Sequence, residues 1–134
     1  MKVLVLRTDK PEAEVGVSDN ERKLAYETWQ AHRELSATIN LKIEEIIGQA
    51  SILANALEGI VVYEGPGSFT GLRIGITVAN AMAYAHNIPV IASGGKNWIK
   101  DGIKKLEAGH PPAGGNKIAL PRYGAEPNIT KPRK

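Results

Sequence analysis

Short apolar runs separated by turn residues dominate the first half of the chain and predict strands. Residues 2–6 and 59–63 are largely apolar runs, as expected of central strands that are buried on both faces. Residues 14–18 and 23–30 flank an Asp-Asn turn and predict a hairpin of two further strands. A fifth run, residues 88–92, precedes Ser-Gly-Gly, so the sequence predicts five strands.

Three other segments have the periodicity of helices. In the first, from Glu34 to about Ala50, apolar side chains recur three or four positions apart. A second helix follows the loop that starts at Glu64 and runs to about Asn87, and a third covers residues 96–106. The apolar positions that define the first helix include Leu35, Ile39, Ile43 and Ile46.

The lengths of the connections determine the topology that we expect. Strands one to three are joined by short turns and should be antiparallel, whereas strands one, four and five need helical crossovers and should be parallel. The expected architecture is α/β, with a mixed five-stranded sheet of order 3-2-1-4-5. Because crossovers are right-handed, both crossover helices should lie side by side on one face of the sheet, with the last helix on the other face.

Composition narrows the class of protein. At 134 residues, with 43% hydrophobic and 23% charged residues, the chain fits one soluble globular domain. The absence of cysteine excludes disulfides, thiolate metal sites and a cysteine nucleophile. No apolar run approaches the ~18 residues needed to span a bilayer, and the N-terminus does not fit a signal peptide, so a cytoplasmic location is expected.

The two ends of the chain differ in composition. Residues 1–107 contain all the predicted strands and helices, and we expect them to form one lobe. Residues 108–134 are a Pro/Gly-rich basic tail without periodicity, with five Lys and Arg residues against Glu126 alone. Such a tail either stays solvated or touches phosphate or an acidic partner.

The second helix is more apolar than packing against one sheet requires. Its polar residues fall on one narrow stripe, which leaves an apolar arc of roughly two-thirds of the circumference. Within that arc, small residues at every fourth position form a row that lets another backbone approach closely. The row either meets a partner's helix, which the surplus apolar arc favours, or faces the chain's own sheet; it consists of Gly71, Gly75, Ala79 and Ala83.

The loop before this helix, Glu-Gly-Pro-Gly-Ser-Phe-Thr-Gly from Glu64, has two interpretations. A glycine-rich turn that opens a helix is a ready anion site. However, the loop lacks the lysine of a P-loop, and the strand after the helix does not end in the acid of a dinucleotide fold. We therefore expect a tight turn with Ser68 as the N-cap of the helix.

The sequence predicts no catalytic residue, no cofactor site and no metal site. His32, His86 and His110 have no second histidine or carboxylate at ligand spacing. Ser68 does not stand in the Gly-x-Ser-x-Gly arrangement of a nucleophile elbow.

Residues 65–75, Gly-Pro-Gly-Ser-Phe-Thr-Gly-Leu-Arg-Ile-Gly, resemble the signature of the TsaB (YeaZ) family. Residues 31–47 resemble that family's first helix with its preceding histidine, here His32, and residues 86–95 resemble the strand after the signature. The end of the chain, from Leu120, is similar to the family's closing segment. The resemblance implies a single lobe of the actin-like, ribonuclease-H-like fold, whose sheet order is the one expected above.

The resemblance also implies a role. Family members are accessory subunits that bind the catalytic paralogue TsaD, with TsaE joining the complex, in N6-threonylcarbamoylation of adenosine 37 of tRNA. Their two crossover helices form a bundle with the equivalent pair of TsaD, or with a second TsaB copy, so Gly75→Leu should abolish pairing and leave the fold intact. The expected partner-binding residues are Leu35, Ile39, Ile43, Gly67, Ser68, Phe69, Thr70, Gly71, Leu72, Arg73, Gly75, Ala79, Met82 and Ala83.

Two features depart from the family pattern. The second lobe that family members carry before the closing segment is absent here, and the chain has Ala-Gly-His-Pro-Pro-Ala-Gly-Gly from Ala108 instead. Arg7-Thr8-Asp9 also stands where the fold's first phosphate-binding turn has Asp-Thr-Ser. ATP binding by this chain alone is therefore not expected. The alternatives are a nucleotide-binding enzyme of the actin-like superfamily and a tRNA-binding module that uses the basic tail.

Overall fold

The computed structural model describes residues 1–20 and 22–109, and the expected basic tail from residue 110 onward lies outside them. All five strands and three helices are present. Two short 3₁₀ turns, His32–Glu34 and Ala54–Ala56, complete the described elements. The strands and helices are β1 (Lys2–Arg7), β2 (Glu12–Asp19), β3 (Arg22–Gln30), α1 (Leu35–Gln49), β4 (Gly59–Tyr63), α2 (Phe69–His86), β5 (Val90–Ser93) and α3 (Trp98–Glu107).

The sheet has the expected topology. Its order is β3-β2-β1-β4-β5. The pairs β1–β2 and β2–β3 are antiparallel, and β1–β4 and β4–β5 are parallel. The mixed five-stranded α/β sheet is therefore confirmed, and strands β1 and β4 lie at its centre, as their continuous apolar runs predicted.

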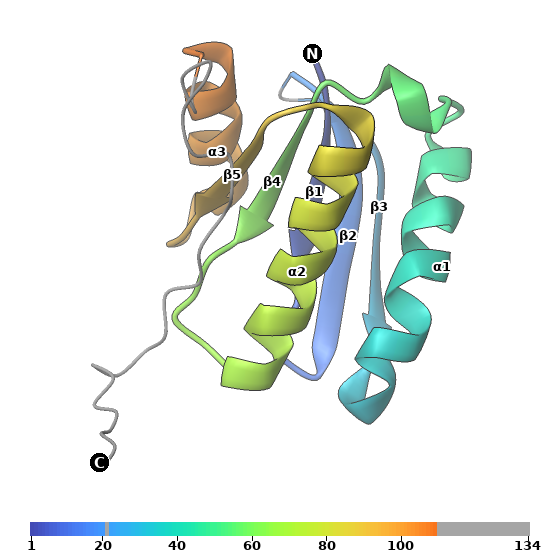
Figure 1. The fold of residues 1–134 in the computed structure, drawn as a ribbon, viewed down its shortest axis with the longest axis vertical. Coiled ribbons are helices and arrows are strands. Elements are labelled where there is room, and N and C mark those ends of the chain that lie inside the picture. Colours follow the sequence, from blue (N-terminus) through green and yellow to red (C-terminus); the bar gives the residue numbers. More distant parts are fainter. Residues whose placement is uncertain (21, 110–134) are drawn as a thin grey trace.

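The helices cover the sheet as the handedness of the crossovers predicted. Helices α1 and α2 lie side by side over one face, and α3 lies over the other (Figure 1). Alternate residues of β1 divide between the two layers: Leu4 and Leu6 pack under α1 and α2, whereas Val3 and Val5 pack toward α3. This alternation follows from the two-residue period of a strand.

Because of a helix cap, β5 begins two residues later than expected and α2 ends one residue earlier. Asn87 adopts a left-handed conformation, with φ of 55°, and its N–H donates to the Ala83 and Tyr84 carbonyls. The Ile88 N–H also donates to the Ala83 carbonyl, at 3.0 Å. Ile88 thus belongs to the C-terminal cap of α2, and β5 begins only at Val90.

The α3 side of β2 and β3 carries a tyrosine in an unusual setting. The Tyr26 ring lies over Gly16, where a Cβ atom would collide with it, and the Tyr26 hydroxyl donates to the Glu14 carboxylate. Burial and this hydrogen bond raise the pKa of Tyr26 above its ordinary value. The neutral phenol is therefore favoured in the folded state more than in the unfolded chain.

This raised pKa predicts a loss of stability in alkali. The contribution of Tyr26 is complete below about pH 10, the unfolded value, and is lost as the pH rises toward the higher folded value. Urea unfolding measured from pH 8 to 11 should therefore show a steeper fall in unfolding free energy for the parent than for Tyr26→Phe. The Tyr84→Phe variant is the control, because the Tyr84 side chain is 90% exposed; a parental slope in Tyr26→Phe would contradict the prediction.

Candidate functional site

The glycine-rich loop wraps around the turn that follows β1. The Ser68 side chain accepts a hydrogen bond from the Gly71 N–H at 3.5 Å, which confirms Ser68 as the N-cap of α2. The Ser68 N–H in turn donates to the Asp9 carbonyl at 3.3 Å. The Thr8 hydroxyl donates to the Gly71 carbonyl at 2.6 Å, so the start of α2 is fastened to this turn at several points.

The glycines of the loop and helix leave room for the same turn. A Cβ atom at Gly71 would lie far inside contact distance of the Thr8 carbonyl oxygen, and one at Gly75 would collide with the Thr8 hydroxyl. A Cβ at Gly67 would collide with the Asp9 side chain. The glycines are therefore required by packing within the chain, where a side chain would separate α2 from β1.

The small-residue row packs inward, which is the second of the two arrangements that the sequence allowed. Gly75, Ala79 and Ala83 are buried against this chain's own sheet, and Gly71 packs on Thr8. Several apolar residues of α2 outside this row are exposed or half-buried. The sequence did not decide which side of α2 packs on the sheet, because α2 is apolar around most of its circumference. In the structure, the side with the smallest residues packs inward.

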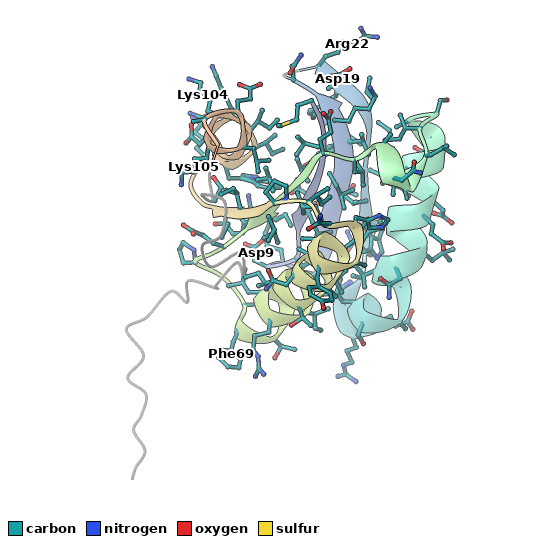
Figure 2. All side chains as sticks on the ribbon, turned by 45° about the horizontal axis from the view of Figure 1, so that its top comes forward. Asp9, Asp19, Arg22, Phe69, Lys104 and Lys105 are labelled. Carbon is teal, nitrogen blue, oxygen red and sulfur yellow. The ribbon has the colours of Figure 1, made fainter. Side chains whose placement is uncertain are left out.

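The other predicted partner-binding residues divide into two groups. Leu35, Ile39, Ile43 and Leu72 are buried in the chain's own core, so the single chain does not expose them to a partner. Six others are exposed or half-buried, and their role in binding stays a prediction. Figure 2 shows one of them, Phe69, projecting from the start of α2, where its side chain is 54% exposed. The six are Gly67, Ser68, Phe69, Thr70, Arg73 and Met82.

A second apolar row lies on the solvent side of α1 and α2. Its members recur at helical spacing. Five of them are exposed, and the other three, Ile74, Val78 and Met82, are half-buried at the edge of the core. Beside it, a hollow of about 390 Å³ between the two helices is lined by residues such as Ser36, Ile74 and Val78. We call this row the outer face; it consists of Ala37, Leu41 and Gly48 on α1 and Ile74, Val78, Ala81, Met82 and Ala85 on α2.

The Asp9 carboxylate, in the turn beside the glycine loop, is paired with Arg7. Arg7 donates to the Asp9 carboxylate through Nε at 2.7 Å and through Nη2 at 3.2 Å. The guanidinium also stacks over the Tyr63 ring, 3.9 Å from its centre, and the Tyr63 hydroxyl donates to the Pro66 carbonyl. The hydrogen bond to Asp9 raises the pKa of Arg7 above its ordinary value, despite the opposing effect of burial. Asp9, labelled within the fold in Figure 2, thus serves to hold Arg7 and the loop together.

Replacing Asp9 alone should lower the free energy of unfolding more than replacing Arg7 and Asp9 together. In Asp9→Ala the Arg7 guanidinium stays partly buried without its carboxylate, and we expect a loss of about 2 kcal/mol of unfolding free energy. In the double variant Arg7→Met/Asp9→Ala, an uncharged side chain covers Tyr63, so at least half of that loss should return. Urea unfolding of the two variants tests this, and a double variant less stable than Asp9→Ala would contradict it.

The described part of the chain contains no other group with evident chemistry. Within residues 1–20 and 22–109, no cluster of three His, Cys, Asp or Glu side chains could hold a metal ion. In the same part of the chain, no helix is both long enough and apolar enough to cross a bilayer. His32 and His86 lie on different elements, and the third histidine, His110, is outside the described residues.

The sheet order and the three helices define an actin-like lobe, and comparison with solved structures agrees. The chain superposes on YeaZ from Pseudomonas aeruginosa with a TM-score of 0.65 and 26% identity, over 69% of this chain and 43% of that one. A second structure from the same organism, described as similar to the peptidase YeaZ, matches equally well. The resemblance of this chain to the TsaB (YeaZ) family is confirmed.

The sequence comparisons give a second family name. Residues 29–92 match the model of TsaD, tRNA N6-adenosine threonylcarbamoyltransferase. The enzyme of that name from Geotalea daltonii is 42% identical over 73 residues, which are 54% of this chain and 20% of the enzyme. The one from Listeria welshimeri is 43% identical over 61 residues, 46% of this chain and 18% of the enzyme. The chain thus spans about a fifth of the length of these curated relatives.

Proposed function

We propose that the chain is a non-catalytic subunit that binds a TsaD-family protein and supports N6-threonylcarbamoylation of adenosine 37 of tRNA. The outer face of α1 and α2 makes the contact and packs against the equivalent helix pair of the partner. One observation carries the proposal: in a fold shared with YeaZ, two helices that already pack on their own sheet still leave apolar residues exposed at helical spacing.

The composition of the outer face suits a helix bundle. Contiguous apolar surface on a single chain marks an interaction site more often than scattered residues do. Leu41 is 56% exposed, and its neighbours on the row are small, which allows the axes of two helices to approach closely. In Figure 1, α1 and α2 form one layer on the sheet, so a partner pair would complete a four-helix bundle.

The proposal assigns the chemistry to the partner. The matched transferases are about five times as long as the matched segment, and the Asp9 carboxylate beside the glycine loop is paired with Arg7. In this proposal TsaE also joins the complex, and the complex acts in the cytoplasm. In the absence of the TsaD-family protein, the same outer face pairs with a second copy of this chain.

The mass of the full chain in solution tests the proposal. Light scattering after gel filtration at about 50 µM should give a dimer for the chain alone and a one-to-one complex with the TsaD-family protein of the same cell. A chain that stays monomeric in both samples would overturn the proposal. Calorimetry with ATP and magnesium on the chain alone addresses the enzyme alternative, and tight binding there would favour that alternative.

A further inference from the structure

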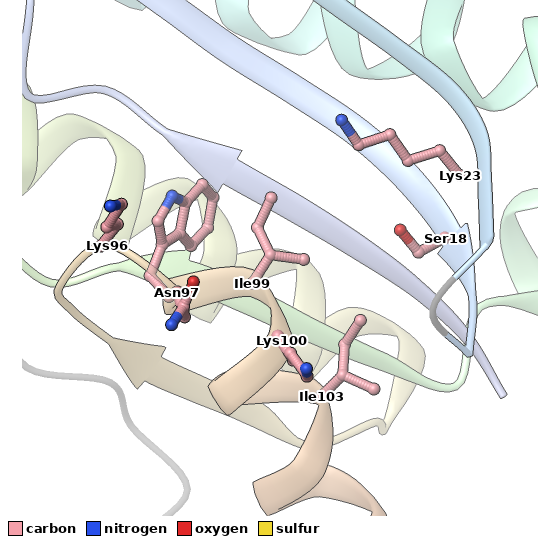
Figure 3. Close-up of a pocket in the computed structure, with 8 residues that line it drawn as sticks. Ser18, Lys23, Lys96, Asn97, Ile99, Lys100 and Ile103 are labelled. Atoms are coloured by element: carbon pink, nitrogen blue, oxygen red, sulfur yellow. The ribbon is translucent and has the colours of Figure 1, made fainter.

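On the opposite side of the sheet, a groove runs between α3 and the hairpin of β2 and β3. Its volume is about 280 Å³. Figure 3 shows Ser18 and Lys23 on the strand side of this groove and Ile99, Lys100 and Ile103 on the side of α3. We call it the α3 groove; its residues used below are Ser18, Lys23, Lys96, Ile99, Lys100 and Ile103.

Three lysines surround the α3 groove and bring positive charge to it. In the part of the chain that the structure describes, none of Lys23, Lys96 and Lys100 forms an ion pair with a carboxylate. The Lys23 ammonium lies 4.5 Å from the centre of the Tyr26 ring, a cation–π contact that involves no carboxylate. Uncompensated charge of one sign around a concave surface attracts a ligand of the opposite sign.

The wall and floor of the groove add two further features. Ser18 is only 4% exposed, its hydroxyl faces the groove in Figure 3, and it has no hydrogen-bond partner among the described residues. Because no buried side-chain oxygen or nitrogen of the described residues lacks a partner, the Ser18 oxygen is reached from the groove and can bond a ligand there. Ile99 and Ile103 make the α3 side apolar. The groove therefore combines an apolar wall, one free hydroxyl and a cationic rim.

We propose that the α3 groove binds an acidic peptide segment of a partner protein. One apolar side chain of that segment packs on Ile99 and Ile103, while flanking carboxylates meet Lys23 and Lys100. The Ser18 hydroxyl donates to a carboxylate or carbonyl oxygen of the same segment. Because this face is separated from the outer face by the sheet, the peptide and a helix-pair partner bind at the same time.

Two other occupants fit the groove less well. Nucleic acid bound through such a groove would use exposed aromatic rings for stacking, and the aromatic residue here, Trp98, is buried with its ring edge-on to Tyr63 at 5.7 Å. The chain's own residues 110–134 carry five Lys and Arg residues and one Glu, so they share the sign of the rim. Charge and shape together favour the acidic peptide.

Fluorescence anisotropy with the full chain tests the proposal. The probe is a labelled peptide of sequence EDELFDE, and the comparison peptide EDESSDE has the same charge without the apolar pair. We expect the comparison peptide to bind at least tenfold more weakly. Lys100→Glu should weaken binding of the probe roughly fivefold to tenfold. Lys105→Glu, which makes the same charge change on the outer side of α3 in Figure 2, should leave it within about twofold.

Other outcomes would overturn the proposal. Equal binding of the two peptides, or equal effects of Lys100→Glu and Lys105→Glu, would show only general attraction of anions to a basic helix. Tighter binding of a labelled single-stranded RNA than of EDELFDE, lost in Lys100→Glu, would assign the groove to nucleic acid instead. Absence of any binding below 1 mM peptide would remove the site. Proton–nitrogen NMR spectra of the folded variants exclude unfolding as the cause.

Discussion

Replacing Gly71 with alanine is expected to lower the free energy of unfolding by about 2 kcal/mol, even though alanine is the better helix former. The new Cβ would lie far inside contact distance of the Thr8 carbonyl oxygen. Because this is a backbone atom, no side-chain rotation relieves the collision, and α2 must move away from β1. The movement would also break the hydrogen bond from the Thr8 hydroxyl to the Gly71 carbonyl.

The matched control is Gly48→Ala in α1. A Cβ atom at Gly48 meets nothing within 4 Å, so this variant should be as stable as the parent or gain up to about 1 kcal/mol from helix propensity. Urea unfolding followed by circular dichroism measures both variants. Similar unfolding free energies for Gly71→Ala and Gly48→Ala would mean that Gly71 is not required by its contact with Thr8.

The same geometry changes how the glycine signature is interpreted. Gly75→Leu was expected to abolish pairing and leave the fold intact, but a side chain at Gly75 would collide with Thr8. That variant should instead destabilise the fold. The glycines of residues 65–75 are therefore explained by the packing of α2 on the first turn, and a test of the interface must use other positions.

The fold could be predicted from the sequence because local and topological rules agree. Two strands, Lys2–Arg7 and Gly59–Tyr63, carry apolar runs that predict a central place in the sheet with both faces covered. The lengths of their connections then allow one sheet order, and the handedness of crossovers places α1 and α2 together. Only element ends were displaced, as at Ile88, where a left-handed Asn87 extends the helix cap.

The candidate sites were harder to predict, since each depends on which residues meet across the fold. A helical wheel shows that α2 is apolar around most of its circumference, but it does not show which side packs on the sheet. The pairing of Arg7 with Asp9 was not predicted either, since Asp9 lies in the turn after β1, where no strand period fixes the direction of its side chain. The α3 groove joins Ser18 and Lys23 to Lys100, about 80 positions away, and no local pattern signals that contact.

Ala81→Glu and Leu41→Glu are expected to weaken binding of the TsaD-family protein by at least roughly a hundredfold, because each would bury an unpaired carboxylate in an apolar interface. Ala81 lies on α2 and Leu41 on α1, and both are exposed in the single chain, so the fold should be retained. Lys105→Glu adds the same charge on α3, across the sheet, and should bind like the parent.

Gel filtration and calorimetry of each variant with the partner measure the effect, and thermal unfolding of the variants alone confirms that they fold. If Leu41→Glu and Ala81→Glu both bind like Lys105→Glu, the outer face is not the interface, whatever complex the parent forms. If Ala81→Glu alone loses binding, the contact is made by α2 without α1, and the four-helix arrangement is wrong. If both variants lose binding and keep their fold, the partner contacts both α1 and α2, as it would in a four-helix bundle.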